Sequence, residues 1–120
     1  MGRKPKNKKA YLRKKADRLL QQKYVPLNPI CIVCGAQTSE MHHVVYKSQS
    51  SRLRYAEGNL VPLCVRCHAR HHLSGDAIIL ATIIKKRGQD WFDALQHIRN
   101  DYCKTTIGAY EQTIERLEKL

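Results

Sequence analysis

The sequence predicts an α+β fold: a small zinc-stapled core of two short strands and one helix, with flanking helices before and after it. Three observations lead to this prediction. Two CxxC pairs bracket the middle of the chain, strand-like apolar segments lie between them, and both ends carry apolar residues at helical spacing. A chain of 120 residues has room for one small domain, and a domain of this size often needs an added staple.

The first segment, residues 1–23, is strongly basic and is expected to form an arm that continues as a helix. Helix-forming residues run from Ala10 to Gln22, and several leucines among them are available for packing. The first nine residues lack apolar anchors, so we expect them to be disordered on their own. Pro26 and Pro29 cannot continue a helix, and they place a boundary after the arm.

The middle segment, residues 24–75, is expected to hold the functional core. Between the two CxxC pairs the sequence predicts one strand near residues 41–46 and another near residues 60–63, joined by a polar, basic loop. A short helix should follow the second pair, and Ser74 and Gly75 mark its end.

The last segment, residues 76–120, predicts a helical extension. Asp76 is a candidate N-cap for a helix that stops at Gly88, a second helix should span Gln89 to Asn100, and a third should begin near Thr105. The side chains that the last two helices are expected to bury are Trp91, Phe92, Leu95, Ile98, Ile107, Tyr110, Ile114, Leu117 and Leu120.

The positive net charge of the chain indicates which class of partner it binds. The formal net charge of +12 and the pI near 9.8 favour a polyanion, with nucleic acid ahead of an anionic membrane. No stretch approaches the roughly 20 apolar residues that cross a bilayer, and no apolar signal-peptide core follows the charged start of the chain. We therefore expect a soluble, cytoplasmic protein with no membrane partner.

The four paired cysteines predict a structural zinc site. Cys31 and Cys34 form one CxxC, Cys64 and Cys67 form the other, and thiolates at this spacing assemble tetrahedral zinc sites. Redox dithiols are an alternative, although they explain one pair more easily than two. Haem attachment is a second alternative, because CVRCH matches CxxCH, but it leaves the first pair unexplained.

Histidines between and after the cysteine pairs predict a second, catalytic ion. His42 and His43 are neighbours in a strand-like run, so their side chains should face opposite ways and have different tasks, one binding metal and the other accepting a proton. His68 and His72 are four apart on the predicted helix and therefore share a face suited to closing a metal site with His42. His71, three residues after His68, is the alternative ligand.

Together, His43, Asn59 and His68, set between CxxC pairs as HH...GNLVPLCVRCHARHH, resemble the ββα-metal core of HNH endonucleases, also called the His-Me finger. The resemblance covers residues 31–72 and implies metal-dependent hydrolysis of DNA. It implies the following roles: His43 as general base, Asn59 as the group that orients it, and His42 and His68 as metal ligands, with His72 added from members that have a His-x3-His helix.

The identity of the catalytic ion stays open at this point. Many cysteine-bearing members of the family have aspartate where this chain has His42. Imidazole suits transition metals better than it suits magnesium, so magnesium, manganese, nickel and zinc are all candidates.

A wider resemblance extends to the flanks. The lysine-rich leader, CIVCGAQTS, RLRYAEGNL and GQDWFDAL are similar to the phage NinG/Rap recombination nucleases. That family implies a bacterial or phage-encoded protein that cuts branched intermediates such as Holliday junctions, with recombination proteins as partners. Paired cuts would need a homodimer, for which the C-terminal helices with Leu117 and Leu120 could provide an interface or, equally, could be intramolecular core.

Basic side chains supply the candidate DNA contacts. The loop from Lys47 to Tyr55 could hold phosphates beside the metal, although a solvated loop has the same composition. The predicted contacts are Arg13, Lys14, Lys47, Arg52, Arg54, Arg66 and Arg70. A non-catalytic, zinc-stabilised nucleic-acid-binding module is the main alternative function; it explains the charge and the cysteines but not the histidines and Asn59 together.

Overall fold

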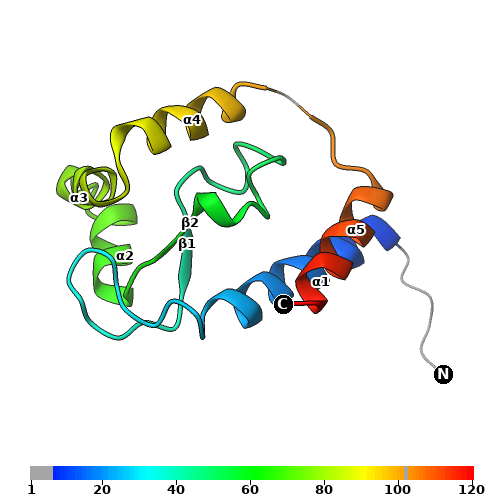
Figure 1. The fold of residues 1–120 in the computed structure, drawn as a ribbon, viewed down its shortest axis with the longest axis horizontal. Helices are drawn as coiled ribbons and strands as arrows, with labels where there is room; N and C mark the ends of the chain where they lie inside the picture. The colour runs from blue at the N-terminus through cyan, green and yellow to red at the C-terminus, as the bar shows by residue number, and fades with distance from the viewer. Residues whose placement is uncertain (1–6, 102) are drawn as a thin grey trace.

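The computed structural model describes residues 7–101 and 103–120 and confirms the predicted small α+β fold (Figure 1). A two-stranded sheet and a short helix lie between two groups of longer helices. In chain order the elements are α1 (Lys8–Tyr24), β1 (Met41–His43), the 3-10 turn η1 (Glu57–Asn59), β2 (Leu60–Pro62), α2 (Val65–His72), α3 (Ala77–Arg87), α4 (Gln89–Arg99) and α5 (Ile107–Glu118).

The sheet is antiparallel and shorter than the sequence predicts. Its register pairs Met41 with Pro62, His42 with Val61 and His43 with Leu60. Beyond His43, the Asn59 side chain takes the backbone N–H and C=O of Val45 that a longer ladder would use. The strand prediction for residues 41–46 is therefore wrong by three residues, because a side chain replaces a strand partner.

The two ends of the chain pack together as the pair α1 and α5. Apolar residues of α1 share a hydrophobic core with α5, and this core reaches the sheet at Met41 and Leu60. The buried helix residues are Leu12, Ala16, Leu20, Tyr24, Tyr110, Ile114 and Leu117. The N-terminal helix is thus part of the fold rather than a separate arm.

The start of α1 differs slightly from the prediction. Asn7 caps it by accepting a hydrogen bond from the Ala10 N–H (3.0 Å), so the helix begins at Lys8, two residues earlier than predicted. Residues 7–9 are therefore ordered in the structure. The expectation of disorder for the first six residues lies outside the described part of the chain.

The boundaries of α3 agree with the prediction. The Asp76 side chain accepts a hydrogen bond from the Ile78 N–H (3.0 Å), and Gly88 ends the helix with a φ of 103°, which glycine adopts without strain. Ile79 and Ile83 pack against the cysteine cluster and β2 in a second core. No helix in residues 7–101 and 103–120 has the length and apolar character needed to span a membrane.

Burial along α4 and α5 is less complete than predicted. Of the four α4 side chains expected inside, Leu95 is buried, Trp91 and Phe92 are half-buried, and Ile98 is 37% exposed. The reason is that α4 packs through one narrow stripe, with Leu95 against Val45 and Leu53. At the ends of α5, Ile107 and Leu120 are exposed, which corrects the prediction for both.

Candidate functional site

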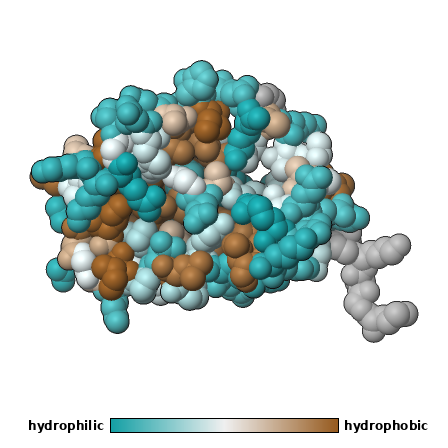
Figure 2. Space-filling model, viewed as in Figure 1, coloured by the Kyte–Doolittle hydropathy of each residue, from teal (hydrophilic) through white to brown (hydrophobic). Residues whose placement is uncertain are grey.

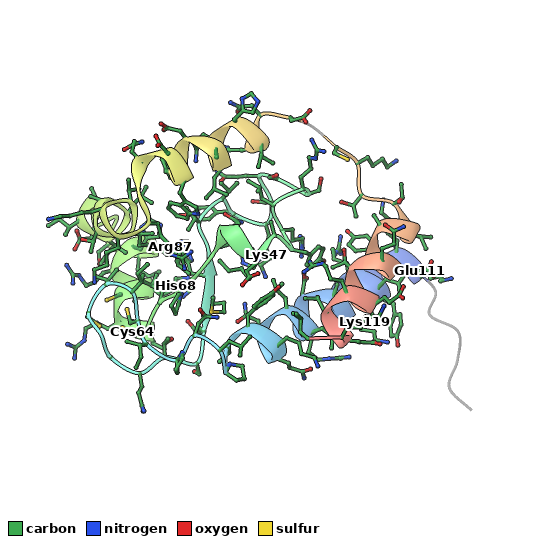
Figure 3. The ribbon with its side chains drawn as sticks, in the orientation of Figure 1. Lys47, Cys64, His68, Arg87, Glu111 and Lys119 are labelled. Carbon is green, nitrogen blue, oxygen red and sulfur yellow. The ribbon has the colours of Figure 1, made fainter. Side chains whose placement is uncertain are left out.

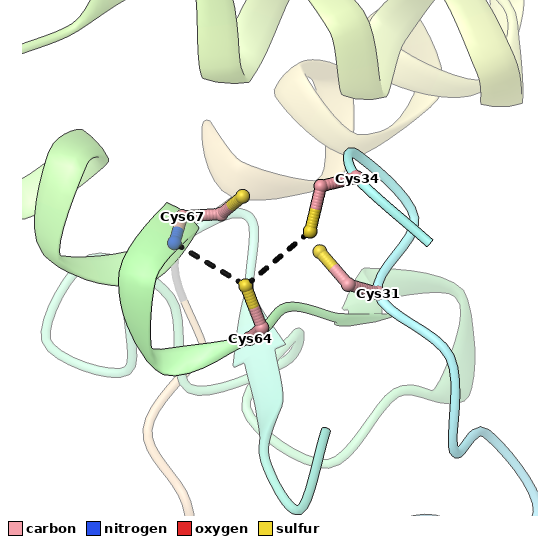
Figure 4. Close-up of side chains that lie close together, drawn as sticks. All are labelled: Cys31, Cys34, Cys64 and Cys67. Carbon is pink, nitrogen blue, oxygen red and sulfur yellow. Dashed lines mark hydrogen bonds between the residues drawn. The ribbon is translucent and has the colours of Figure 1, made fainter. Parts of the chain in front are cut away.

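The four paired cysteines converge on one point (Figure 4). Cys31 and Cys34 lie in a turn, while Cys64 is the N-cap of α2 and Cys67 is in its first turn. All four Sγ atoms lie within 4.8 Å of one another, and those of Cys34 and Cys64 are 3.6 Å apart. A tetrahedral site with Zn–S bonds of about 2.3 Å has sulfur–sulfur edges of about 3.8 Å, so the cluster could hold a structural zinc.

Backbone geometry prepares the cluster for a cation. Burial opposes ionisation of Cys31, but backbone N–H groups of Cys34 and Cys64 outweigh it and lower the pKa of that thiol to about 6. Burial raises the pKa of the Cys67 thiol, so this group does not ionise at neutral pH without help. A divalent ion supplies that help, because zinc ligands bind as thiolates.

His42 lies at the centre of a second group, the imidazole cluster, formed with His68, His71 and His72 of α2. The His42 ring centroid is 5.1 Å from those of His68 and His72 and 5.3 Å from that of His71. Ligand nitrogens of His42, His71 and His72 all lie within 4.8 Å of one another. Burial, followed by repulsion from the other imidazoles, lowers the pKa of His42 to about 3, so its nitrogen lone pair is available to a metal.

His68 is oriented by a carboxylate whose role the sequence analysis missed. The Nδ1 atom of His68 is 3.1 Å from an oxygen of Glu40. A carboxylate accepts the Nδ1 proton, which leaves the Nε2 lone pair free, and metal-binding histidines are held in this way. The signal was present in the sequence, because Glu40 comes just before the strand that carries His42.

The structure brings the rings of His68, His72 and the alternative ligand His71 together beside His42, but the group whose ligand nitrogens all lie within 4.8 Å of one another is His42, His71 and His72, without His68. His68 and His72 have ring centroids 4.5 Å apart, and His71 and His72 have centroids 4.9 Å apart. They can meet because positions i, i+3 and i+4 share one face of α2. An all-imidazole donor set fits a transition ion better than it fits magnesium.

His43 has a different environment from that of its neighbour. It is 7% exposed, and its Nε2 atom lies 2.8 Å from the carbonyl oxygen of Arg54. Because a carbonyl only accepts, Nε2 must carry the hydrogen and Nδ1 must be the basic nitrogen. Burial lowers the pKa of His43, with Lys47 acting in the same direction, so the ring is neutral at pH 7 and can accept a proton.

A single cavity joins His43 to the imidazole cluster. It has a volume of about 670 Å³, and its lining includes His42, His43, His68, His72 and Lys47. In Figure 3, Lys47 lies between α2, which carries His68, and the helix pair α1 and α5. We call this space the site cavity; it offers a neutral base, metal-binding nitrogens and a cation to one ligand.

Asn59 is fully buried and acts on the loop that follows His43. Its Oδ1 atom accepts from the Val45 N–H (2.7 Å), and its Nδ2 donates to the carbonyls of Val45 (2.9 Å) and Leu53 (3.1 Å). The Leu53 carbonyl precedes Arg54, whose own carbonyl holds the ring of His43. Among the described hydrogen bonds, Asn59 therefore reaches His43 through this loop and not by direct contact.

The loop is also tied to α1 by an ion pair. The Arg54 guanidinium donates to both oxygens of Asp17, with Nε–Oδ1 at 2.9 Å and Nη2–Oδ2 at 2.6 Å. Although burial opposes it, the hydrogen bond from Arg54 lowers the pKa of Asp17. Asp17 is a site residue that the sequence analysis missed, and its signal was that it is the single acid among the bases of residues 1–23.

The predicted DNA contacts fall into two groups. The side chains of Arg52, Arg54 and Arg70 pair with Asp101, Asp17 and Asp76 respectively. The side chains of Arg13, Lys14, Lys47 and Arg66 are exposed and make no ion pair within residues 7–101 and 103–120. This unpaired group is free to meet a polyanion, whereas the paired group is held by contacts within the fold.

The comparisons with known proteins give one match. Residues 31–73 match the family model described as HNH endonuclease. The matched segment, which we call the HNH domain, contains the cysteine cluster, His43 and the imidazole cluster, while α1, α3, α4 and α5 lie outside it. No curated protein and no solved structure matches the chain.

Proposed function

We propose that this chain is a metal-dependent endonuclease that hydrolyses DNA phosphodiester bonds. One observation carries the proposal: His43, with its N–H fixed by the Arg54 carbonyl, lines the same cavity as the imidazole cluster. Phosphodiester hydrolysis needs such a base and a metal site side by side, and the HNH domain at residues 31–73 suggests this class of activity.

The residues of the site cavity divide the chemistry among them. Nδ1 of His43 takes a proton from the attacking water, and the Arg54 carbonyl keeps the ring in the tautomer that can do so. Lys47 places positive charge near the phosphate. His42, His68 and either His72 or His71 would hold a divalent ion, which would supply charge stabilisation at the phosphate and at the leaving 3′ oxygen. The products would carry 5′-phosphate and 3′-hydroxyl ends.

Substitution of the base tests the proposal. His43→Ala should lower the rate of nicking of supercoiled DNA by roughly 10²- to 10⁴-fold, the usual effect of general-base assistance. Each rate is measured with magnesium, manganese, nickel and zinc, together with circular dichroism and zinc content, which should not change. The matched control is His97→Ala, an exposed histidine on α4, which should cut like the wild type.

Two outcomes would contradict the proposal. If His43→Ala nicked DNA at the wild-type rate, His43 would not be the base. If the folded, zinc-loaded wild type bound DNA and nicked it with none of the four ions, the chain would be a non-catalytic nucleic-acid-binding module.

We further propose branched recombination intermediates as the substrate. What supports this step is the resemblance of the flanking segments, such as RLRYAEGNL, to phage recombination nucleases. A panel of linear, flapped and four-way DNA at equal concentration should show the highest kcat/KM on the four-way junction, with paired cuts made by a dimer. Equal rates on linear and four-way DNA would overturn this assignment and leave the nuclease proposal standing.

A further inference from the structure

We propose that a second cavity, beside the site cavity, binds the phosphate backbone of the DNA strand that flanks the bond to be cut. This inference rests on the proposed nuclease function and specifies how its substrate is held. The cavity has a volume of about 350 Å³ and is lined by five cations, Lys9, Arg13, Lys47, Arg99 and Lys104. We call it the basic groove.

Charge in the basic groove is unbalanced. The lining contains one carboxylate, Asp101, and that carboxylate pairs with Arg52 outside the groove. Within residues 7–101 and 103–120, none of the five groove cations makes an ion pair. Five unpaired cations around a hollow attract a chain of phosphates, since each phosphate contact releases counterions from DNA.

The basic groove continues from the site cavity. Lys47 and Ser48 line both spaces, so they form the border between them. A strand whose reacting phosphate lies beside His43 therefore passes Lys47 and enters the groove with its next phosphates. Lys47 would contact the backbone at the point where the strand crosses from one cavity to the other.

Four separate parts of the chain build the basic groove, and one of them is α5, which supplies Tyr110. The first turns of α1 supply Lys9 and Arg13, the loop after β1 supplies residues 47–51, and the end of α4 with the following segment supplies Arg99 and Lys104. Figure 2 shows this face hollowed between α4 and the pair α1 and α5, with mostly hydrophilic residues around the hollow. Only the loop belongs to residues 31–73, so the flanking helices extend the DNA contact beyond the HNH domain.

The polar lining of the groove also suits contacts with the DNA backbone rather than with base edges. Phosphates are contacted by arginine, lysine and hydroxyl side chains, which give position without sequence preference. Besides its cations, the groove presents the side chains of Ser48, Gln49 and Asn100. We therefore expect affinity from the groove to be equal for unrelated DNA sequences.

Salt dependence of binding tests the groove without any cutting. In a His43→Ala background, fluorescence anisotropy with a labelled duplex gives Kd at several salt concentrations. The double variant Arg13→Gln/Arg99→Gln should lower the slope of log Kd against log salt by about 2, since each phosphate contact contributes about 0.9. The control Lys85→Gln/Lys119→Gln removes two exposed lysines that do not line the groove and should leave the slope unchanged.

Replacing charged DNA phosphates by uncharged analogues shows which phosphates contact the basic groove. Replacement of phosphates by methylphosphonates, one position at a time on one flank, should weaken binding by the groove-intact protein at two or more adjacent positions. The same replacements should affect Arg13→Gln/Arg99→Gln at fewer positions, because two of the five groove cations are already absent. Lys9→Gln/Lys104→Gln gives an independent second variant with the same expectation.

The result that overturns the inference is a groove variant whose salt slope equals that of the lysine control. Nicking by the protein with His43 intact is a separate measurement. A protein that fails to nick, yet loses salt slope in the groove variants, would refute the nuclease proposal and leave the groove as a DNA-binding surface.

Discussion

At the scale of single residues, two histidines of the site, His43 and His68, have one ring nitrogen held by a neighbouring oxygen, which leaves the other nitrogen free. The Arg54 carbonyl fixes the proton of His43 on Nε2, and the Glu40 carboxylate fixes that of His68 on Nδ1. His42 has no such partner among the described hydrogen bonds; burial and repulsion from the neighbouring imidazoles lower its pKa and keep it neutral. Three imidazoles within one small region can therefore act as base, oriented ligand and buried ligand.

The role of Glu40 leads to a prediction for metal affinity. Glu40→Gln should weaken binding of the ion proposed for the imidazole cluster by about 10- to 100-fold, because a carboxylate behind a ligating histidine fixes the tautomer of that histidine and raises its basicity. The measurement is the ion concentration that gives half-maximal nicking, together with calorimetric binding of the same ion to the zinc-loaded His43→Ala protein. Glu111→Gln, an exposed glutamate on α5, is the control. Equal midpoints for Glu40→Gln and wild type would exclude this role.

At the scale of elements, the loop between β1 and η1 is held from both sides. Asn59 fixes it from the sheet through Val45 and Leu53, and Asp17 fixes it from α1 through Arg54. The Trp91 indole also donates to the Gly58 carbonyl (2.7 Å), which ties α4 to the turn before Asn59. Helices outside the HNH domain thus set the position of the loop that carries the partner of His43.

The ion pair between α1 and the loop predicts a pH dependence of stability. Because the folded-state pKa of Asp17 is lowered, its contribution is fully present above the unfolded value of about 3.9 and is lost as pH falls below it. At neutral pH, Asp17→Asn should lower the free energy of unfolding by about 1 to 3 kcal/mol, as expected for a partly buried charged hydrogen bond. Urea unfolding at pH 7 and at pH 3 measures this effect, and the difference between variant and wild type should shrink at pH 3.

A control for that prediction comes from the same pair of helices. Glu118→Gln removes the more exposed pair of Lys15 and Glu118, with an N–O distance of 3.6 Å, and should change stability little at either pH. A loss from Asp17→Asn that stayed constant from pH 7 to pH 3 would show that the carboxylate charge is not what holds the loop.

The sequence predicted elements whose signals are local. Asp76 and Gly88 bound α3 because a cap and a positive φ are properties of single residues, and the CxxC spacing brings the two thiols of each pair together for a similarly local reason. It did not predict the end of β1 or the pairing of Arg54, because both depend on a partner many residues away. Nothing near Arg54 in the sequence distinguishes it from Lys47, which stays exposed.

At the scale of the whole molecule, two hydrophobic cores support the site from opposite sides. One joins α1 and α5 to Met41 and Leu60, and the other joins the cysteine cluster to α3. The site cavity lies between them, since β1 and α2 supply its histidines. Loss of either core should move His43 relative to the imidazole cluster.

The final prediction concerns the core that the cysteine cluster forms with β2 and α3, which we call the cysteine-based core. Cys64 is both a cluster thiol and the N-cap of α2, so Cys64→Ser should release zinc and unfold the helix that carries His68, His71 and His72. Structural zinc contributes about 10 to 16 kcal/mol of apparent binding free energy in small domains, which is comparable to the whole stability of a typical chain this size. The α1 and α5 core has its own apolar contacts and should keep part of its helix content.

Trp91, the single tryptophan, reports on this change because it packs against the cysteine-based core and bonds to Gly58. Its fluorescence should shift to the red in Cys64→Ser, and zinc content measured by mass spectrometry should fall from one ion per chain to none. Cys103→Ser is the matched control, since this thiol is exposed and lies outside the cluster. A Cys64→Ser protein with one bound zinc and wild-type fluorescence would mean that the cysteine cluster is not what holds His43 and the imidazole cluster together.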